Sequence, residues 1–305
     1  MEKNNKINNS ENIEVIKEVG AISYKALVKI SERVKLGAKV MDIAKFSEDF
    51  LKENNYKPAF PLNISINDYA AHYSPKLGDE AAFEENQIVK LDFGAEKNGF
   101  FGDCAITIDL SNNNQKYIDA TNEAVENALS IIRHGTRIRD IGREIAKTIE
   151  SKNLKPIRNL GGHGVELNEL HSDPFIPNFD NNDETELEEG MVIAIEPFAT
   201  NGKGIVTETD FIEICRFNKT VNTRSDASRL LLNEIEKRFE KRPFAIKWLS
   251  DIVDSKFRLY SAINELIRED ALIPSPALIE LGNGIVSQTE IELIVEKDSC
   301  TVLTK

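Results

Sequence analysis

The chain has 305 residues, 41% of them hydrophobic, which is enough to bury a sizeable core in one large domain or in one domain carrying an insertion. Its formal net charge of −13 argues against specific or general nucleic-acid binding, because phosphate neutralisation needs clustered lysine and arginine. The polar start, Met1 to Glu14, and the lack of any apolar run near ~18 residues exclude a secretory signal and a membrane span, so we expect a cytoplasmic protein without a membrane partner.

Internal repeats organise the predicted elements. Val34 to Ile43 resembles Ile132 to Ile141, and each segment follows one amphipathic helix and opens another. Glu85 to Ala95 likewise resembles Glu189 to Ala199, and each of these is a short β-rich run that ends near a carboxylate. The sequence therefore predicts the same order of elements twice.

An Asn-Gly pair follows each β-rich run, Asn98-Gly99 in the first copy and Asn201-Gly202 in the second. Such pairs are the strongest short-range signal for a tight hairpin turn, so we expect a hairpin in both copies. The repeated order of helix, helix and hairpin predicts an α+β domain in which helices pack on one face of an antiparallel sheet. Approximate two-fold symmetry should relate its halves.

Beyond about Thr223 the hydrophobic period becomes helical and continues to Ile273, with charged residues between the apolar ones. The periodic positions are Leu230, Leu231, Ile235, Phe257, Ile263 and Ile267. Strand-like residues then return from Asn283 to Thr304 and should rejoin the core sheet. We therefore predict a catalytic domain of residues 1–216 and 277–305, interrupted by a helical, winged-helix-like subdomain at residues 217–276.

The first hairpin should bring two aspartates together. If Asn98-Gly99 is its two-residue loop, Asp92 lies opposite Ala105. Asp103 then lies opposite Gly94, and the two carboxylates share one face as diagonal neighbours about 7–8 Å apart. Carboxylates that converge between apolar strands repel each other and lose hydration, so they need a cation, a shared proton or basic partners. We favour a metal pair over the alternative of solvated carboxylates on an ordinary sheet face.

Two further residues favour the metal hypothesis. Asp103 lies within the apolar run Phe100 to Ile106, which is unusual for a wet sheet edge. Glu196 holds the position equivalent to Asp92 in the second repeat, and the symmetry brings it toward the same place. A cysteine zinc site and a disulfide framework are improbable, because the three cysteines are far apart and lack CxxC spacing.

The four histidines have different contexts. His163 lies in the run Gly161 to Gly164, where glycines permit the close backbone approach that a site loop often needs, and His171 follows eight residues later. His72 lies in apolar sequence and could equally be a core histidine. His134 follows Arg133 near a predicted helix end, where a cation is common, and we assign it no chemistry.

Taken together, seven motifs resemble those of type 2 methionine aminopeptidases, and they occur in the family's order over nearly the whole chain. The N-terminus lacks the long charged extension of the eukaryotic members, so the archaeal form is the nearer match. The resemblance implies a pita-bread fold and removal of the initiator methionine. The motifs are Pro58 to Asn67 with Ala70 to Tyr73, Leu91 to Gly94, Gly102-Asp103, Gly162 to Gly164, Ala194 to Thr200, Arg242 to Phe244, and Asn283 to Glu290.

The resemblance also implies a set of metal ligands. Reading from the residues alone leaves Glu290 and Glu292 open as alternatives, because both face the same way on a strand, and the family pattern selects Glu290. The chain departs from the family beside this residue: Thr289 stands where phenylalanine is usual, and Ile291-Glu292 replaces the usual His-Thr. The implied ligands are Asp92, Asp103, His163, Glu196 and Glu290.

Four carboxylates and one imidazole form an oxygen-rich site, which favours two divalent ions such as Mn²⁺, Fe²⁺ or Co²⁺, with Zn²⁺ as the alternative. By resemblance, Asp103 and Glu290 bridge the ions and Asp92 binds one of them. His163 and Glu196 bind the other, and Glu196 accepts the proton of a metal-bridging hydroxide or water that attacks the first peptide bond. His171 would hold the oxyanion, and His72 the substrate's amide or amine.

The implied substrates are the N-terminal Met-peptides of nascent proteins, with a small second residue. Phe60 and Leu170 would contribute to an apolar pocket for the methionine side chain, although Phe60 could also be a core residue. We expect a monomer, and the ribosome is a possible partner of the insertion. Two alternatives remain open: an aminopeptidase or dipeptidase that acts before proline, and a non-catalytic homologue that binds nucleic acid or protein.

Overall fold

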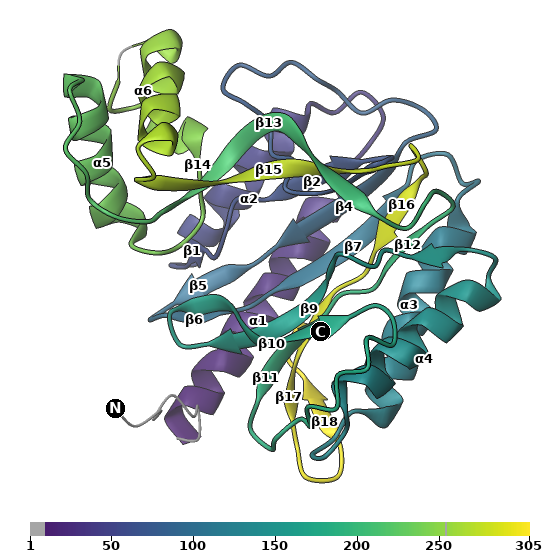
Figure 1. Ribbon diagram of the computed structural model, residues 1–305. Coiled ribbons are helices and arrows are strands. Elements are labelled where there is room, and N and C mark those ends of the chain that lie inside the picture. The colour runs from purple at the N-terminus through teal and green to yellow at the C-terminus, as the bar shows by residue number, and fades with distance from the viewer. Residues whose placement is uncertain (1–9, 254) are drawn as a thin grey trace.

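Two helices followed by short strands form the first half of the protein (Figure 1). The structure is a computed structural model that describes residues 10–253 and 255–305, so residues 1–9 of the polar start noted above lie outside it. The elements of the first half are α1 (Ser10–Ser31), α2 (Val40–Glu53), β1 (Lys57–Pro58), β2 (Asn63–Ile66), β3 (Tyr69–Ala71), β4 (Ile88–Phe93), β5 (Ala95–Lys97), β6 (Phe100–Phe101) and β7 (Cys104–Asp109).

The second half repeats this order and is then interrupted. Its elements are α3 (Gln115–Ile131), α4 (Ile138–Ser151), β8 (Lys155–Pro156), β9 (Gly161–Glu166), β10 (Glu169–Pro177), β11 (Val192–Ile195), β12 (Phe198–Thr200) and β13 (Val206–Phe217). The remaining elements are α5 (Asp226–Phe239), β14 (Phe244–Ala245), the 3₁₀-helix η1 (Ile246–Leu249), α6 (Lys256–Arg268), β15 (Leu272–Glu280), β16 (Val286–Gln288), β17 (Ile291–Val295) and β18 (Cys300–Val302).

Strand pairing confirms the predicted two-fold relation. In the first half β4 pairs with β2 and β7, and in the second half β11 pairs with β9 and β17, antiparallel in every case. Similarly, β5 lies between β1 and β6, and β12 lies between β8 and β16. The C-terminal strands β16 and β17 therefore occupy the positions in the second half that β6 and β7 occupy in the first. This agrees with the prediction that the strand-like residues from Asn283 to Thr304 rejoin the core sheet.

The helices cover the sheets through one apolar face each. In α4, for example, Ile138, Ile141, Ile145 and Ile149 recur every three or four residues and are all buried. They pack in one cluster with α3 and the second-half strands, whereas α1 and α2 form a separate cluster with the first-half strands. Each half thus has its own core, and the polar site must lie where the two sheets meet.

The first Asn-Gly hairpin has the predicted register. Asn98 and Gly99 both have positive φ and connect β5 to β6, and the pairing of β4 with β7 places Asp92 opposite Ala105. The prediction for Asn201-Gly202 was wrong. Strand β12 pairs with β16 instead of turning back, and the side chain of Asn201 accepts a hydrogen bond from the backbone of Ile285, 84 residues later.

The helical insertion stands apart at the far end of the β13–β15 ribbon (Figure 1). Its helices share a separate apolar cluster, in which Leu231, Ile235 and Ile263 are buried. Two residues of the predicted helical pattern are instead on the surface, since Leu230 is 49% exposed and Phe257 80%. Strand β13 ends at Phe217, which pairs with Leu272 at the start of β15. Strand β15 therefore begins inside the predicted insertion of residues 217–276.

Candidate metal centre

An isolated antiparallel bridge joins Ala105, in the first-half sheet of β2, β4 and β7, to Glu290, next to β17 of the second half. The amide of Ala105 donates to the carbonyl of Glu290 at 3.2 Å, and the amide of Glu290 donates to the carbonyl of Ala105 at 2.9 Å. Because Asp92 lies opposite Ala105 on its other side, Asp92 and Glu290 flank one small alanine on the same face. Two carboxylates from opposite ends of the chain thus meet at the junction of the sheets.

Three of the predicted ligands form a compact cluster. One ligand atom each from Asp103, His163 and Glu290 lies within 4.8 Å of the others, and all three side chains are buried. The Nε2 atom of His163 is 3.6 Å from Oδ2 of Asp103. Donor atoms at these separations can share one ion, so this cluster is a candidate metal site.

The other two predicted ligands, Asp92 and Glu196, flank the amide of Gln288 and remain partly exposed. The amide nitrogen of Gln288 donates to Oε2 of Glu196 at 3.4 Å. Burial raises the pKa of Asp92 to about 7, and the Gln288 amide opposes that shift. Burial and the charge of Asp92 also raise the pKa of Glu196 well above its ordinary value. Gln288 was only part of a motif in the sequence, and its buried amide could not be recognised as a site group there.

The cluster carries more negative charge than its hydrogen bonds compensate. Burial raises the pKa of Asp103 and of Glu290 well above their ordinary values, and neighbouring carboxylates add to both shifts. Among the described atoms, Oδ1 of Asp92 and Oδ1 of Asp103 are buried without a hydrogen-bond partner. Carboxylate oxygens suit ions such as Mn²⁺ and imidazole nitrogen suits ions such as Fe²⁺, so the residues fit divalent transition-metal ions.

His163 is oriented for a ligand role. Its Nδ1 lies 3.1 Å from the carbonyl oxygen of Gly164, so this nitrogen carries the proton and Nε2 keeps its lone pair toward Asp103. Burial lowers its pKa to about 4, which leaves the ring neutral at pH 7. The ring of His171 is 4.3 Å from that of His163, measured between centroids.

His171 and His72 approach the cluster from other strands. His171, on β10, keeps solvent access, although the surrounding protein desolvates it and the charges of His163, His72 and Arg216 add to the effect, lowering its pKa to about 3. His72 follows β3 with a φ of 62°, and its Nδ1 is 3.2 Å from the Pro276 carbonyl oxygen. A positive φ is unusual for a residue other than glycine and often marks functional positions.

The two predicted pocket residues belong to one apolar cluster. Phe60 is 7% exposed and Leu170 6%, and both pack with the first-half core. His134 lies apart from the site, exposed, where its Nδ1 accepts a hydrogen bond from the backbone of Glu189 at 3.3 Å. This position, away from the cluster, is consistent with assigning His134 no chemistry, although an Nδ1 that accepts a hydrogen bond does not support the expected cation.

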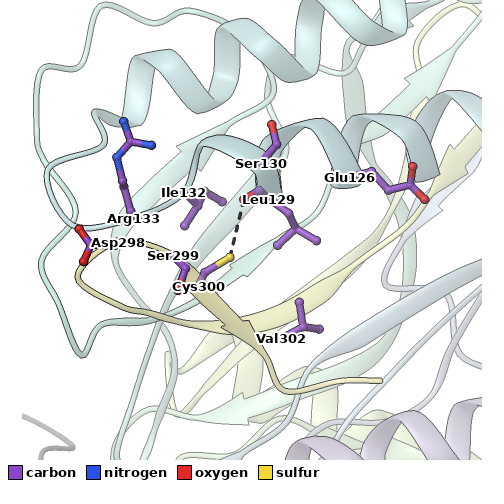
Figure 2. A pocket seen from close by; sticks show the side chains of 9 residues that line it. All are labelled: Glu126, Leu129, Ser130, Ile132, Arg133, Asp298, Ser299, Cys300 and Val302. Atoms are coloured by element: carbon purple, nitrogen blue, oxygen red, sulfur yellow. Dashed lines mark hydrogen bonds between the residues drawn. The ribbon is translucent and has the colours of Figure 1, made fainter.

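A cavity of about 420 Å³ lies elsewhere, between α3 and the β17–β18 hairpin (Figure 2). None of the residues that line it is a predicted site residue. Its only thiol, Cys300, has a pKa raised by burial and is therefore a weak nucleophile. The carboxylate and histidine cluster therefore shares no residue with this cavity, which is lined by Glu126, Leu129, Ser130, Ile132, Arg133, Asp298, Ser299, Cys300 and Val302.

Comparisons with known proteins agree with this geometry. The model of metallopeptidase family M24 matches residues 14–223. A methionine aminopeptidase of Archaeoglobus fulgidus is 41% identical over 288 residues, covering 94% of this chain and 97% of its own. Among solved structures, a thermophilic Arx1 is similar with a TM-score of 0.84 at 18% identity, covering 97% of this chain and 91% of that one. The methionine aminopeptidase of Thermotoga maritima is similar with a TM-score of 0.72 at 23% identity, with 98% of both chains covered.

Proposed function

The chain belongs to metallopeptidase family M24 as a metal-dependent methionine aminopeptidase with the pita-bread fold, and we propose how its own residues divide the work of removing an N-terminal methionine. The proposal depends chiefly on one observation, the meeting of Asp103, His163 and Glu290 within 4.8 Å. Around that cluster, Asp92 and Glu196 would complete a site for two divalent ions, for which Mn²⁺, Fe²⁺ and Co²⁺ are the preferred candidates.

When bound, such ions polarise the scissile carbonyl and lower the pKa of a water, which supplies a nucleophile without serine or cysteine. In our proposal both ions would share Asp103 and Glu290, Asp92 would help to hold one of them, and His163 and Glu196 would help to hold the other. The isolated bridge between Ala105 and Glu290 supports these roles, because it brings ligands from both halves to one common point.

Proton transfer and charge stabilisation fall to residues at the edge of the cluster. Glu196 would accept a proton during attack, since its carboxylate is partly exposed and held by only one long hydrogen bond, from Gln288. His171 would stabilise the negative charge that develops on the substrate carbonyl, and its solvent access leaves room for a peptide. His72 would bind the substrate amide or amine, with its Nδ1 held by the Pro276 carbonyl.

Specificity for methionine would come from the apolar side of the site. Phe60 and Leu170 would contribute to a pocket for the thioether side chain, and a small second residue would be preferred beside it. The substrates would be new proteins in the cytoplasm, a location that fits the three free cysteines. Among the described residues no helix is long and apolar enough to span a membrane.

We further propose that residues 217–276 act as an inserted subdomain on a catalytic domain formed by residues 1–216 and 277–305. The separate apolar cluster of α5, η1 and α6 supports this division. The ribosome is the partner proposed for the insertion, on whose surface Leu230 and Phe257 are exposed. The enzyme itself is proposed to act as a monomer, because all predicted ligands come from one chain.

The decisive experiment measures free methionine released from Met-Ala-Ser and Met-Pro peptides by metal-free protein resupplied with Mn²⁺ or Co²⁺, with Ala-Pro peptides as controls. We expect metal-dependent release that His171→Ala suppresses and His134→Ala does not. Cleavage of the Ala-Pro control alone would instead indicate a proline-directed peptidase. No release with any metal would favour a binding module that has lost catalysis.

A further inference from the structure

Glu292 is a fully buried carboxylate beside the metal centre that the ligand assignment leaves unused. It lies on β17 two residues after Glu290, on the same face of the strand, and is 0% exposed. Neither of its carboxylate oxygens has a hydrogen-bond partner of good geometry among the described residues. The resembled family usually has threonine at this position, so the carboxylate is a departure from the family pattern.

The strand register directs Glu292 toward the ligands. Across three neighbouring strands, His163, Ala194 and Glu292 stand in one row, because β11 pairs Ala194 with His163 on one side and with Glu292 on the other. The row mirrors that of Asp92, Ala105 and Glu290 in the other sheet. In both rows a small alanine separates two side chains that can take part in a metal site, and both rows face the same junction.

Other buried glutamates in this protein accept hydrogen bonds that offset the cost of burying a carboxylate. Glu213, also 0% exposed, accepts hydrogen bonds at 2.8 Å from the Lys247 amide and from the Tyr260 hydroxyl. Glu280 accepts hydrogen bonds from four backbone amides. Glu292 has no comparable donors: burial raises its pKa well above the ordinary value, and the Asp103 amide opposes that shift without making a well-formed hydrogen bond to the carboxylate.

The charge of Glu292 acts on the ligand cluster itself. It adds to the repulsion on the carboxylates of Asp103 and Glu290. Buried like charges without donors need a cation, a shared proton or basic partners, and a divalent ion bound at the ligands would offset them. The three ligand atoms that lie within 4.8 Å of one another belong to Asp103, His163 and Glu290. Glu292 is not a member of this cluster and lies beside it.

We propose that Glu292 is a fifth carboxylate of the metal centre, whose charge strengthens the binding of a divalent cation at Asp103, His163 and Glu290. This inference rests on the proposed metal site. Two divalent ions balance the four assigned carboxylates, so Glu292 makes the loaded centre one charge more negative than in a relative with threonine. Carboxylate oxygen selects hard cations, and Mn²⁺ is therefore the appropriate probe.

The test measures Mn²⁺ affinity and stoichiometry by calorimetry on metal-free wild-type protein, Glu292→Gln and Glu292→Thr. We expect both substitutions to weaken Mn²⁺ binding at least tenfold, because they remove a carboxylate from beside the ligands. Glu213→Gln is the matched control, a buried glutamate on β13 that accepts hydrogen bonds from the insertion, and it should lower the melting temperature and leave Mn²⁺ affinity unchanged.

The outcomes separate the two proposals. Wild-type protein that binds no Mn²⁺, Co²⁺ or Fe²⁺ would overturn the proposed metal centre and this inference with it. Tight binding by wild-type protein with unchanged affinity in the Glu292 variants would overturn only the role of Glu292. Circular dichroism checks that each variant is folded, and if Glu292→Gln is not, Glu292→Thr supplies the same comparison with the residue usual in the family.

Discussion

The Nε2 atom of His163 lies 3.6 Å from Oδ2 of Asp103, while its Nδ1 is 3.1 Å from the carbonyl oxygen of Gly164. The backbone contact fixes which nitrogen carries the proton, so the free lone pair points at the carboxylates before any ion arrives. Such preorganisation lowers the cost of binding a cation, because the imidazole need not reorient or lose a proton at pH 7. The ring is therefore a sensitive position at which to test the site.

His163→Ala should remove most of the stabilisation that metal gives the folded protein. A ligand present at about 100 times its Kd stabilises by about 2.7 kcal/mol, and weakening the affinity removes that gain. Differential scanning calorimetry with and without Mn²⁺ measures the effect as a shift in melting temperature. An equal metal-induced shift in wild type and His163→Ala would contradict the assignment of His163 as a ligand.

The pH dependence of stability should reverse when metal is added. Burial raises the pKa of Asp92 to about 7, whereas an unfolded aspartate titrates near ~3.9. Between these values the folded, metal-free protein binds more protons than the unfolded chain, so its free energy of unfolding falls as the pH rises. Metal competes with those protons, and its stabilising effect must therefore grow over the same range.

Melting temperatures measured from about pH 4.5 to 7.5, in EDTA and in Mn²⁺, test this expectation. The gap between the two curves should widen toward pH 7. Asp92→Asn should flatten the dependence in EDTA, since the amide does not titrate. A gap that stays constant with pH would show that the buried carboxylates are not where the metal binds.

Local sequence signals were sufficient to predict the part of the site in the first half of the chain. The rest of the site depends on contacts between residues that are distant in sequence. Asn98-Gly99 fixes the register of Asp92 within a few residues, so the sequence was sufficient there. The same dipeptide at Asn201-Gly202 was misleading, because β16, which takes the place beside β12 that β6 takes beside β5, follows only after the insertion. Likewise, no local pattern announces the bridge between Ala105 and Glu290, and the choice of Glu290 over Glu292 came from the family resemblance.

Two of the three imidazoles outside the ligand set, those of His171 and His134, should separate catalysis from metal binding. His171→Ala should lower kcat/KM for Met-Ala-Ser by about 10²–10³, the usual cost of losing one group that stabilises an oxyanion. Metal content, measured by mass spectrometry on the dialysed protein, should stay at the wild-type value. His134→Ala is the matched control, since that ring is exposed and distant from the cluster. Parallel loss of metal and activity in His171→Ala would make it a ligand instead.

Gly94 should be essential to the shape of the site. A Cβ at this position would collide with the carbonyl oxygen of Gly102 and press on the ring of Phe60. Gly94→Ala should therefore destabilise the protein by about 1–3 kcal/mol, as overpacking does, and weaken Mn²⁺ binding by displacing Asp103. Gly78→Ala is the control, because its Cβ would meet only a lysine tip and should leave the affinity unchanged. Unaltered Mn²⁺ affinity in Gly94→Ala would show that the site tolerates this displacement.

Glu280 anchors the end of the β13–β15 ribbon where the second hairpin was expected. Its Oε1 accepts hydrogen bonds from the amides of Lys203 and Gly204, and its Oε2 from those of Gly282 and Gly284. Burial alone would raise the pKa of this carboxyl, but the four amides outweigh it and the pKa is lowered. A Cβ at Gly202 would collide with the same carboxylate, so the glycine of the misleading dipeptide is required by close approach.

Glu280→Gln should therefore lower the free energy of unfolding at pH 7 by about 1.5–3 kcal/mol, because the amide NH₂ cannot accept from two of the four donors. A carboxyl whose pKa is depressed on folding contributes stability above its unfolded pKa, and loses that contribution as the pH falls through its folded pKa. The difference between wild type and Glu280→Gln in urea denaturation should therefore shrink below about pH 4. Glu208→Gln, at an exposed position on the same strand pair, should show no comparable difference at either pH. If Glu280→Gln is as stable as wild type at pH 7, the amide cluster does not need the charge, and the ribbon is held by strand pairing alone.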